Sequence, residues 1–360
     1  MFTERTSVGL DVHARSIWAH ATDWQTGQHV SQRLVPKNEE VLAWVRRLPV
    51  PVAVAYEAGP TGFGLARALT GAGVRCVVVA PSKLERPPGD RVKTDKRDAA
   101  RLARLLHIGE LPAVRVPTEA EEAARDLVRA REDARGDLMS ARHRCSKLLL
   151  RHGIVYNDGA AWTAVHEQWL RGHRFDQPGL QTAFDEAFEA VLATLARRDR
   201  LDAAITAMAA TEPWAPVVTR LACVRGIATL TSFGLAVEIG DWQRFTGASI
   251  GAYLGLVPAE DSSGDRRAQG PITKAGNGHA RRLLVEAAWH HRRPLRAPTK
   301  PVRARRAAVS PAVRARAQAA DRRLHHRWKT LDARGKRATV SVVAVARELA
   351  GWCWSIAVMS

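Results

Sequence analysis

The sequence predicts an α/β domain at the N-terminus, followed by two mainly helical regions. Residues 7–13, "SVGLDVH", alternate between two sets of side chains as a half-buried strand does. Two short apolar runs, 52–57 and 74–80, have the length of buried strands and flank a segment with helical spacing. After about Pro117 the chain is densely charged and poor in β-branched residues, which favours long helices.

The N-terminal elements follow one another in an order that indicates a mixed sheet. An antiparallel meander comes first, and its second and third strands are joined by the turn "WQTGQ". Helices and strands then alternate, as in parallel crossover units, and Asn38 is a plausible cap of the first helix. This is the order of the ribonuclease H-like fold, although a few other α/β folds share parts of it. The expected elements are strands 7–13, 17–23 and 29–35, helix 38–48, strand 52–57, helix 63–73, strand 74–80 and a helix within 91–106.

We expect three regions: a ribonuclease H-like domain (1–115), a helical region (116–210) and a mainly α C-terminal domain with a basic tail (211–360). The helical region contains two long segments of helical period that are expected to pack as a hairpin or coiled coil around an aromatic, helical tip. The C-terminal domain should begin with a helix–hairpin–helix and continue through a loop-rich stretch into a basic helix. Its Arg- and Pro-rich residues 292–337 are expected to be partly disordered without a partner.

Charge indicates a polyanionic partner. The 360 residues carry a net charge of +19, and between Arg281 and Arg337 there are 18 lysines and arginines against three acids. Nucleic acid is the first expectation and an anionic membrane surface the second. The four cysteines are far apart, which argues against a zinc site or a disulfide framework and fits a reducing cytoplasm. No signal pattern opens the chain, and the apolar stretch near its end is interrupted by Arg347 and Glu348, as in a buried helix rather than a membrane span.

The segment "RVKTDKRDAARLARLL" (91–106) places two aspartates on a strongly basic helix. At about 100° per residue, Asp95 and Asp98 share the apolar face of the helix, whereas its arginines point away. That position weakens the interpretation as surface salt bridges. Helix N-termini favour aspartate in any case, through capping and through the helix dipole, so this simpler explanation stays open.

Two further acids occupy matching places. Asp11 lies on the first strand, and Glu57 ends the buried run "VAVAYE". An acid beside an apolar strand is costly unless it is paired or bound to a metal. In the ribonuclease H-like order, the first strand, the fourth strand and the last helix converge at one end of the sheet. Asp11, Glu57, Asp95 and Asp98 would then form one cluster, whose charges Mg²⁺ or Mn²⁺ would neutralise. Two such ions about 4 Å apart can support phosphodiester cleavage.

Five segments carry a family resemblance. "GLDVH", "YEAGPTG" and "KTDKRDAARLARLL" resemble the catalytic segments of DEDD-type insertion-sequence transposases, relatives of the Piv DNA invertase with a RuvC-like N-terminal domain. "VRGIATLTSFGLAVEIGDWQRF" and "YLGLVPAEDSSGDRRAQGPITKAGNGHARRLL" resemble the C-terminal transposase domain of that family. The resemblance covers roughly residues 5–290 and implies that Asp11, Glu57, Asp95 and Asp98 are the metal-binding tetrad.

The same resemblance implies a serine nucleophile in "DSSGDRR", with Ser263 as first choice and Ser262 as second. From the residues alone, a Ser-Ser-Gly loop is more often an ordinary turn. The resemblance further implies donor and target DNA as substrates, a structured bridge RNA that pairs with both, and dimers that assemble into a tetramer. The expected location is the bacterial cytoplasm, in association with the nucleoid.

Two motifs are candidates for nucleic-acid contact. "VRGIATLTS" could present backbone amides to phosphate, although the second hairpin glycine is replaced by Ala228 and a plain packing turn is equally compatible. In "ITKAGNGHARRLL", Lys274, Arg281 and Arg282 flank a glycine-rich loop; solvated surface charge is the alternative. The Arg-rich tail could add salt-sensitive, sequence-independent binding. We expect the paired histidines to be part of the basic surface. They are His290, His291, His325 and His326.

We therefore predict a DNA recombinase that mobilises an insertion sequence. The resemblance implies that an RNA guides this recombinase. A metal-dependent, Holliday-junction-type endonuclease would share the acids but use water as its nucleophile. A nucleic-acid-binding scaffold would need none of this chemistry. A sugar-kinase-like ATPase also opens on a Gly-x-Asp strand, but the further phosphate-binding glycine loops that it needs are not convincing here.

Overall fold

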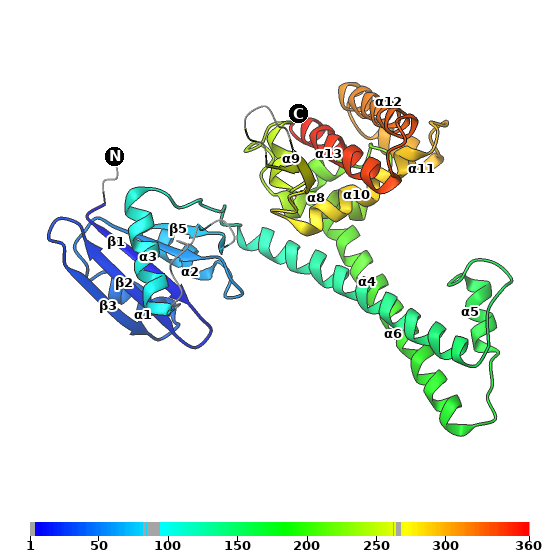
Figure 1. The fold of residues 1–360 in the computed structure, drawn as a ribbon, viewed down its shortest axis with the longest axis horizontal. Coiled ribbons are helices and arrows are strands. Elements are labelled where there is room, and N and C mark those ends of the chain that lie inside the picture. The colour runs from blue at the N-terminus through cyan, green and yellow to red at the C-terminus, as the bar shows by residue number, and fades with distance from the viewer. Residues whose placement is uncertain (1–3, 82–83, 85–93, 262, 264–267, 360) are drawn as a thin grey trace. The chain divides into compact units, whose positions relative to one another are not determined.

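The computed structural model describes residues 4–81, 84, 94–261, 263 and 268–359. The chain divides into two compact units, Met1–Thr118 and Glu119–Ser360, which are described separately below. The N-terminal unit contains the five-stranded sheet, and the C-terminal unit contains the long helices, a two-stranded sheet and the C-terminal helical region (Figure 1).

The N-terminal unit is a five-stranded mixed sheet with strand order β3-β2-β1-β4-β5. Strands β1, β2 and β3 form the antiparallel meander, and β4 and β5 extend it in parallel with β1. The strands are β1 (Thr6–Val12), β2 (Ile17–Asp23), β3 (His29–Leu34), β4 (Val52–Glu57) and β5 (Arg75–Val79); the helices are α1 (Asn38–Val45), α2 (Gly64–Gly71) and α3 (Asp95–Ile108). The predicted mixed sheet is confirmed, and this arrangement is compatible with a ribonuclease H-like fold.

Different helices cover the two faces of the sheet. Val8, Leu10 and Tyr56 pack with α1 and α2 in the larger core of this unit. On the opposite face, Ala53 and Ala55 of β4 pack with Leu106 of α3. One correction concerns α1: Asn38 is its first helical residue rather than its cap, and Lys37 occupies the cap position without a side-chain hydrogen bond.

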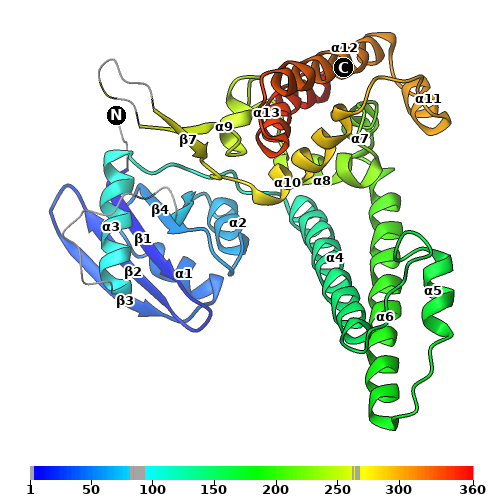
Figure 2. The same ribbon diagram turned by 45° about the vertical axis from the view of Figure 1, so that its right-hand side comes forward.

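The C-terminal unit begins with two long helices that pack along each other. They are α4 (Glu119–Arg151) and α6 (Pro178–Ala209), and the short α5 (Ala164–Arg171) lies between them in the sequence (Figure 2). Aromatic and aliphatic side chains bury the contact near α5, including Leu170, Phe184 and Phe188. The aromatic segment between the long helices is thus helical, as its residues predicted.

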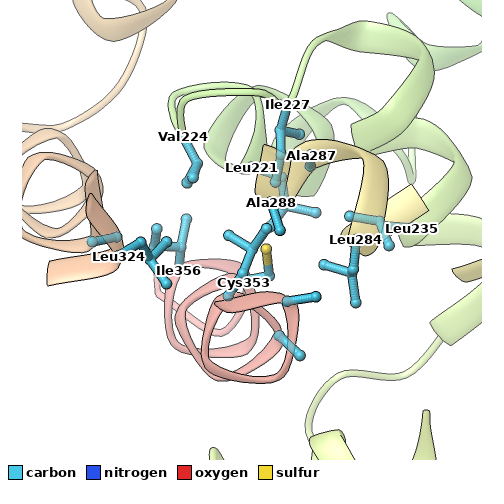
Figure 3. Close-up of a cluster of buried hydrophobic side chains, with 14 of the residues drawn as sticks. Leu221, Val224, Ile227, Leu235, Leu284, Ala287, Ala288, Leu324, Cys353 and Ile356 are labelled. Carbon is cyan, nitrogen blue, oxygen red and sulfur yellow. The ribbon is translucent and has the colours of Figure 1, made fainter. Parts of the chain in front are cut away.

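The remaining elements build the largest core of the protein. They are α7 (Ala215–Leu221), α8 (Thr229–Ile239), α9 (Ser249–Tyr253), β6 (Pro258–Glu260), β7 (Gln269–Ile272), α10 (Gly278–Ala288), η2 (Trp289–Arg292), α11 (Lys300–Ala307), α12 (Pro311–Ala333) and α13 (Ala338–Ala357). Figure 3 shows how Leu221, Leu284 and Ile356, which are far apart in the sequence, meet in this core. Helix α13 is long and apolar enough to cross a membrane, yet half of its apolar window is buried against the other helices.

Two expectations about the basic region are wrong. Most of residues 292–337 is helical rather than disordered, because α12 presents a buried stripe that includes Val313, Leu324 and Trp328 while its arginines point outward. His291 is fully buried rather than part of the basic surface. Burial, followed by the charge of the nearby Arg225, lowers the pKa of His291 to about 3, so its imidazole is neutral at physiological pH.

Candidate metal centre

Asp11 lies near the end of β1, on the face of the sheet that α3 covers. Alternation along the strand places Gly9 and Asp11 on one face and Val8 and Leu10 on the other. Asp11 is half-buried, and burial is the main reason that its pKa is raised. A carboxylate in this position therefore favours any partner that supplies positive charge.

Glu57 is the last residue of β4, the strand next to β1. Gly9 pairs with Ala55 and Leu10 with Tyr56, so Glu57 stands one step beyond these pairs, opposite Asp11. Neighbouring strands lie about 4.8 Å apart. By strand alternation Glu57 belongs to the same face as Ala53 and Ala55, the face that α3 covers.

Helix α3 brings the two remaining acids to the same edge. Thr94 caps the helix by accepting a hydrogen bond from the Arg97 backbone N–H (3.3 Å), which starts the helix at Asp95. Asp95 and Asp98 occupy the first turn, while Ala99, Leu102, Ala103 and Leu106 are buried farther along the helix. The helix dipole favours acids in this first turn, and the packing of α3 against β1 places Asp95 beside Asp11.

Gly9 permits the close approach of α3 to the sheet. A Cβ atom at this position would lie 1.9 Å from the Ala99 carbonyl oxygen and 2.7 Å from the Ala103 backbone nitrogen. Any side chain larger than hydrogen would therefore push the helix, with its aspartates, away from Asp11. The glycine in "GLDVH" is thus required by the geometry of the acidic edge.

Oxygen and nitrogen ligand atoms converge at this edge of the sheet. Among the described residues, no lysine or arginine forms a hydrogen bond with Asp11 that would compensate its charge. One ligand atom each from Asp11, His13 and Asp95 lies within 4.8 Å of the others. His13 Nε2 is 3.2 Å from Asp11 Oδ1 and 3.9 Å from Asp95 Oδ1. The sequence predicted Asp11 and Asp95 as ligands but not His13. His13 could have been predicted from its position two residues after Asp11, on the same face of the strand.

The electrostatics of the group fit a bound cation. The pKa of Asp11 is raised first by burial, and the negative charges of Asp95 and Asp98 raise it further; His13 opposes these effects. A divalent cation would reverse this repulsion, and carboxylate oxygens are the ligands that Mg²⁺ and Mn²⁺ prefer. Asp11, Asp95 and His13 could hold such an ion. Asp98 and Glu57 are not among these three ligand residues: Asp98 acts on Asp11 through its charge, and Glu57 ends the neighbouring strand.

The predicted serine lies in the C-terminal unit. Ser263 is exposed and belongs to the connection between β6 and β7, which is closed by a hydrogen bond from the Asp261 N–H to the Ala268 carbonyl oxygen (3.0 Å). Ser262 lies outside the described residues. An exposed hydroxyl on a hairpin connection is accessible to a large substrate such as DNA.

Two of the three cations predicted to contact nucleic acid, Arg281 and Arg282, have side-chain partners within the fold. Arg281 Nη1 donates to the carbonyl oxygens of Leu254 and Ala275, both at 2.9 Å. Arg282 forms ion pairs with Glu132 and with Glu286. Lys274 has a positive φ of 53°, and its backbone N–H donates to the Gly255 carbonyl oxygen. The two arginines therefore have structural tasks that their sequence pattern did not indicate.

A buried carboxylate holds the neighbouring glycine-rich loop. Glu238 of α8 is 1% exposed and accepts hydrogen bonds from Asn277 Nδ2 (2.6 Å), His279 Nδ1 (3.1 Å) and Arg129 Nε (3.3 Å). Asn277 also caps α10 by accepting from the Ala280 N–H. Glu238 thus joins α4, α8 and α10, so "AGNG" is first of all a structural motif.

We expect Glu238→Gln to destabilise the protein by about 3 kcal/mol at pH 7. Burial alone would raise the pKa of Glu238, but the hydrogen bonds from His279, Arg129 and Asn277 hold it at about 2. A folded-state pKa below the ordinary value stabilises the protein above that value, and the stabilisation is lost as the pH falls toward 2. Urea unfolding should therefore show a difference between variant and parent that is about half as large at pH 3 as at pH 7.

Glu286→Gln is the matched control, because Glu286 pairs with Arg282 at the surface. We expect a change below about 0.5 kcal/mol for it, as exposed ion pairs contribute little. Equal destabilisation by the two variants, or a Glu238→Gln effect that does not change with pH, would contradict the assigned role of Glu238.

Comparison with known proteins identifies two matching families. Residues 8–154 match a family of IS110 DEDD transposases, and residues 218–300 match the family described as "Transposase IS116/IS110/IS902 family". The protein named "Putative transposase y4qE" of Sinorhizobium fredii is 45% identical over 85% of this chain and 75% of its own length. The transposase for insertion sequence element IS1533 of Leptospira borgpetersenii is 31% identical over 92% of this chain and 97% of its own length. The transposase for IS1328 of Yersinia enterocolitica is 24% identical over 79% of this chain and 83% of its own length.

Proposed function

Since this chain belongs to the IS110 family of insertion-sequence transposases and is a DNA transposase, we propose that it exchanges DNA strands through an acidic metal site and a serine nucleophile, guided by RNA. The observation that carries the proposal is the convergence of Asp11, His13 and Asp95 within 4.8 Å. The family explains why a metal-binding group belongs in such a chain.

In this proposal Asp11, Glu57, Asp95 and Asp98 form the metal-binding tetrad, with Mg²⁺ or Mn²⁺ as the ion. When bound, the ion would neutralise phosphate charge and polarise a phosphodiester. The four acids would hold the ion, and His13 orients the Asp11 carboxylate by its contact at 3.2 Å. The register of β1 and β4 supports the membership of Glu57.

Ser263 is the proposed nucleophile. Its Oγ forms a bond to phosphorus as the bond from phosphorus to the departing sugar oxygen breaks, which leaves a serine phosphodiester and a free DNA hydroxyl end. The serine proton is lost, and the departing oxygen gains one. Attack by another DNA hydroxyl end reverses this step and releases the serine, so no phosphodiester energy is lost between the two exchanges. The exposure of Ser263 on the β6–β7 connection supports this role.

The proposed partners are donor DNA, target DNA and a structured bridge RNA. Lys274 remains a candidate contact, and Arg281 and Arg282 have further N–H groups beyond those used in the fold. The packed pair α4 and α6 is the proposed dimerisation region, as a coiled coil, and two dimers would make the working tetramer. We retain residues 1–115, 116–210 and 211–360 as the proposed functional regions, in the cytoplasm near the nucleoid.

We expect Ser263→Ala to abolish a covalent protein–DNA adduct and to lower strand exchange by at least about a thousandfold, as the loss of a nucleophile does. The measurement is an incubation of the purified chain with donor DNA, target DNA, RNA and Mg²⁺, followed by denaturing electrophoresis and mapping of the modified residue. Omission of the RNA tests guidance: specific exchange should then disappear.

Ser249→Ala is the matched control, because Ser249 lies at the start of α9 and its hydroxyl bonds locally to Thr246. This control should still form the adduct. An adduct on Ser262 would move the nucleophile by one residue. DNA cleavage by Ser263→Ala without any adduct would instead support the metal-dependent endonuclease, in which water attacks.

A further inference from the structure

A cleft in the C-terminal unit has an excess of positive charge that the function proposed so far does not use. It has a volume of about 930 Å³ and lies among the α7–α8 hairpin (225–228), the segment that joins η2 to α11 (293–299), α11 and α12. Figure 2 labels α7, α8, α11 and α12. Its lining includes six arginines and a single acid, Asp321; we call it the arginine cleft. The arginines are Arg225, Arg293, Arg296, Arg305, Arg306 and Arg322.

Three of these arginines build the base of the cleft. Arg306 pairs with Asp321 and also donates to the Cys223 carbonyl oxygen (3.1 Å). Arg305 Nη1 donates to the Ile227 carbonyl oxygen (3.2 Å), and Arg225 Nη1 donates to the Arg293 carbonyl oxygen (3.0 Å). Asp321 is buried and receives a further hydrogen bond from the Arg225 backbone N–H (3.0 Å). The only acid of the lining is therefore used within the fold.

The other three arginines are exposed and not engaged. Among the described residues, the side chains of Arg293, Arg296 and Arg322 make no hydrogen bond or ion pair with the protein. They come from the 293–299 segment and from α12, so they stand on different walls of the cleft. Like charges held together without a counter-charge cost free energy, which an anionic ligand would recover.

The shape and chemistry of the lining indicate what that anion is. Arginine forks match the oxygens of phosphate groups, and cations on separate walls suit a chain of phosphates better than a single one. Apolar residues lie beside them on the same segment: Pro294, Leu295 and Pro298. Leu295 is 42% exposed, as a surface that contacts sugars or bases would be. The α7–α8 hairpin packs closely against α10, because a Cβ on Gly226 would lie 2.5 Å from the Ala287 carbonyl oxygen. This packing fixes the position of the hairpin in the wall of the cleft.

We propose that the arginine cleft binds the sugar–phosphate backbone of a nucleic-acid strand, with Arg293, Arg296 and Arg322 as its phosphate ligands. The inference rests on the proposed function only in taking nucleic acid as the polyanion. RNA and DNA share this backbone chemistry, and separate arms of the experiment distinguish them. The cleft holds the strand by charge and shape and does not read its bases.

The test replaces Arg293, Arg296 and Arg322 by glutamine together in the full chain. Binding of a duplex DNA, a single-stranded DNA and a stem-loop RNA is measured by fluorescence anisotropy between about 50 and 200 mM salt. If the cleft holds duplex DNA, the parent should lose about 40-fold more affinity for it over this range than the variant does, because three phosphate contacts change the salt slope by about 2.7. The nucleic acid with the largest change identifies the strand that the cleft holds.

Arg303, Arg334 and Arg337 provide a control with the same loss of charge, since all three are exposed and lie outside the cleft lining. Replacing them by glutamine should leave the salt slope within about one unit of the parent. Equal effects of the two triple variants, or no effect of the cleft variant on any of the three probes, would overturn the proposal. Because the assay measures binding alone, failure of serine chemistry would leave its result unaltered.

Discussion

Replacing Asp11 by asparagine is expected to lower DNA strand exchange by about a thousandfold, because the metal contribution to such chemistry is several kcal/mol. Asparagine keeps the shape of the side chain and removes the negative charge that attracts a cation. The same substitution removes one of the three ligand atoms that lie within 4.8 Å of each other. Asp11 is therefore the position at which charge loss should affect metal and DNA most directly.

A second readout keeps this prediction independent of the complete reaction. Titration of the parent chain with Mn²⁺ alone, followed by calorimetry, should show binding that weakens as the pH falls, since the raised pKa of Asp11 lets protons compete with the ion. Asp11→Asn should reduce the affinity at least tenfold. Glu39→Gln, on the exposed first turn of α1, is the control with the same charge change and should leave Mn²⁺ binding unaltered. Undiminished Mn²⁺ binding by Asp11→Asn would remove the basis for the acidic site.

Gly9→Ala is expected to have the next largest effect, although glycine takes no part in chemistry. Its methyl group would need the space of the Ala99 carbonyl oxygen, 1.9 Å away, and a backbone atom cannot move aside alone. We expect α3 to be displaced as a whole, at a cost of about 2 kcal/mol or more in stability. A displacement of about 1 Å should also reduce strand exchange by about a hundredfold.

Gly71→Ala is the control for this substitution, because Gly71 ends α2 and an added Cβ would meet nothing within 4 Å. It should be neutral or stabilise the unit by up to about 1 kcal/mol. The readouts are the urea midpoint and Mn²⁺ affinity of both variants. A Gly9→Ala protein with parental stability and Mn²⁺ affinity would show that α3 does not need this close approach.

Local pattern was sufficient for the elements of the N-terminal unit. The alternation in β1 and the apolar runs of β4 and β5 are patterns of consecutive residues, so they can be recognised without knowledge of the fold. The same holds for α3, whose cap and apolar face both lie within one segment. The order of these elements then favoured the mixed sheet, because crossover connections allow few alternatives.

Patterns of charge were less informative, because composition alone does not reveal the partner of a charged side chain. Arg281 and Arg282 have the sequence of a nucleic-acid contact, yet they donate to carbonyl oxygens and carboxylates within the protein. His291 follows another histidine in a basic stretch and is nevertheless buried in the core. In α12, the many arginines made the stripe of apolar side chains that packs inward difficult to recognise in the sequence.

The sequence by itself determined the order of strands and helices and the family, and it proposed the acids as candidates, since each is a property of neighbouring residues or of motifs in a fixed order. Only the tertiary structure decided that His13 joins Asp11 and Asp95, that Gly9 admits α3, and that Arg293, Arg296 and Arg322 face one cleft without a counter-charge. These are relations between atoms that the chain brings together from distant positions. Packing determines them, and packing depends on all the elements at once.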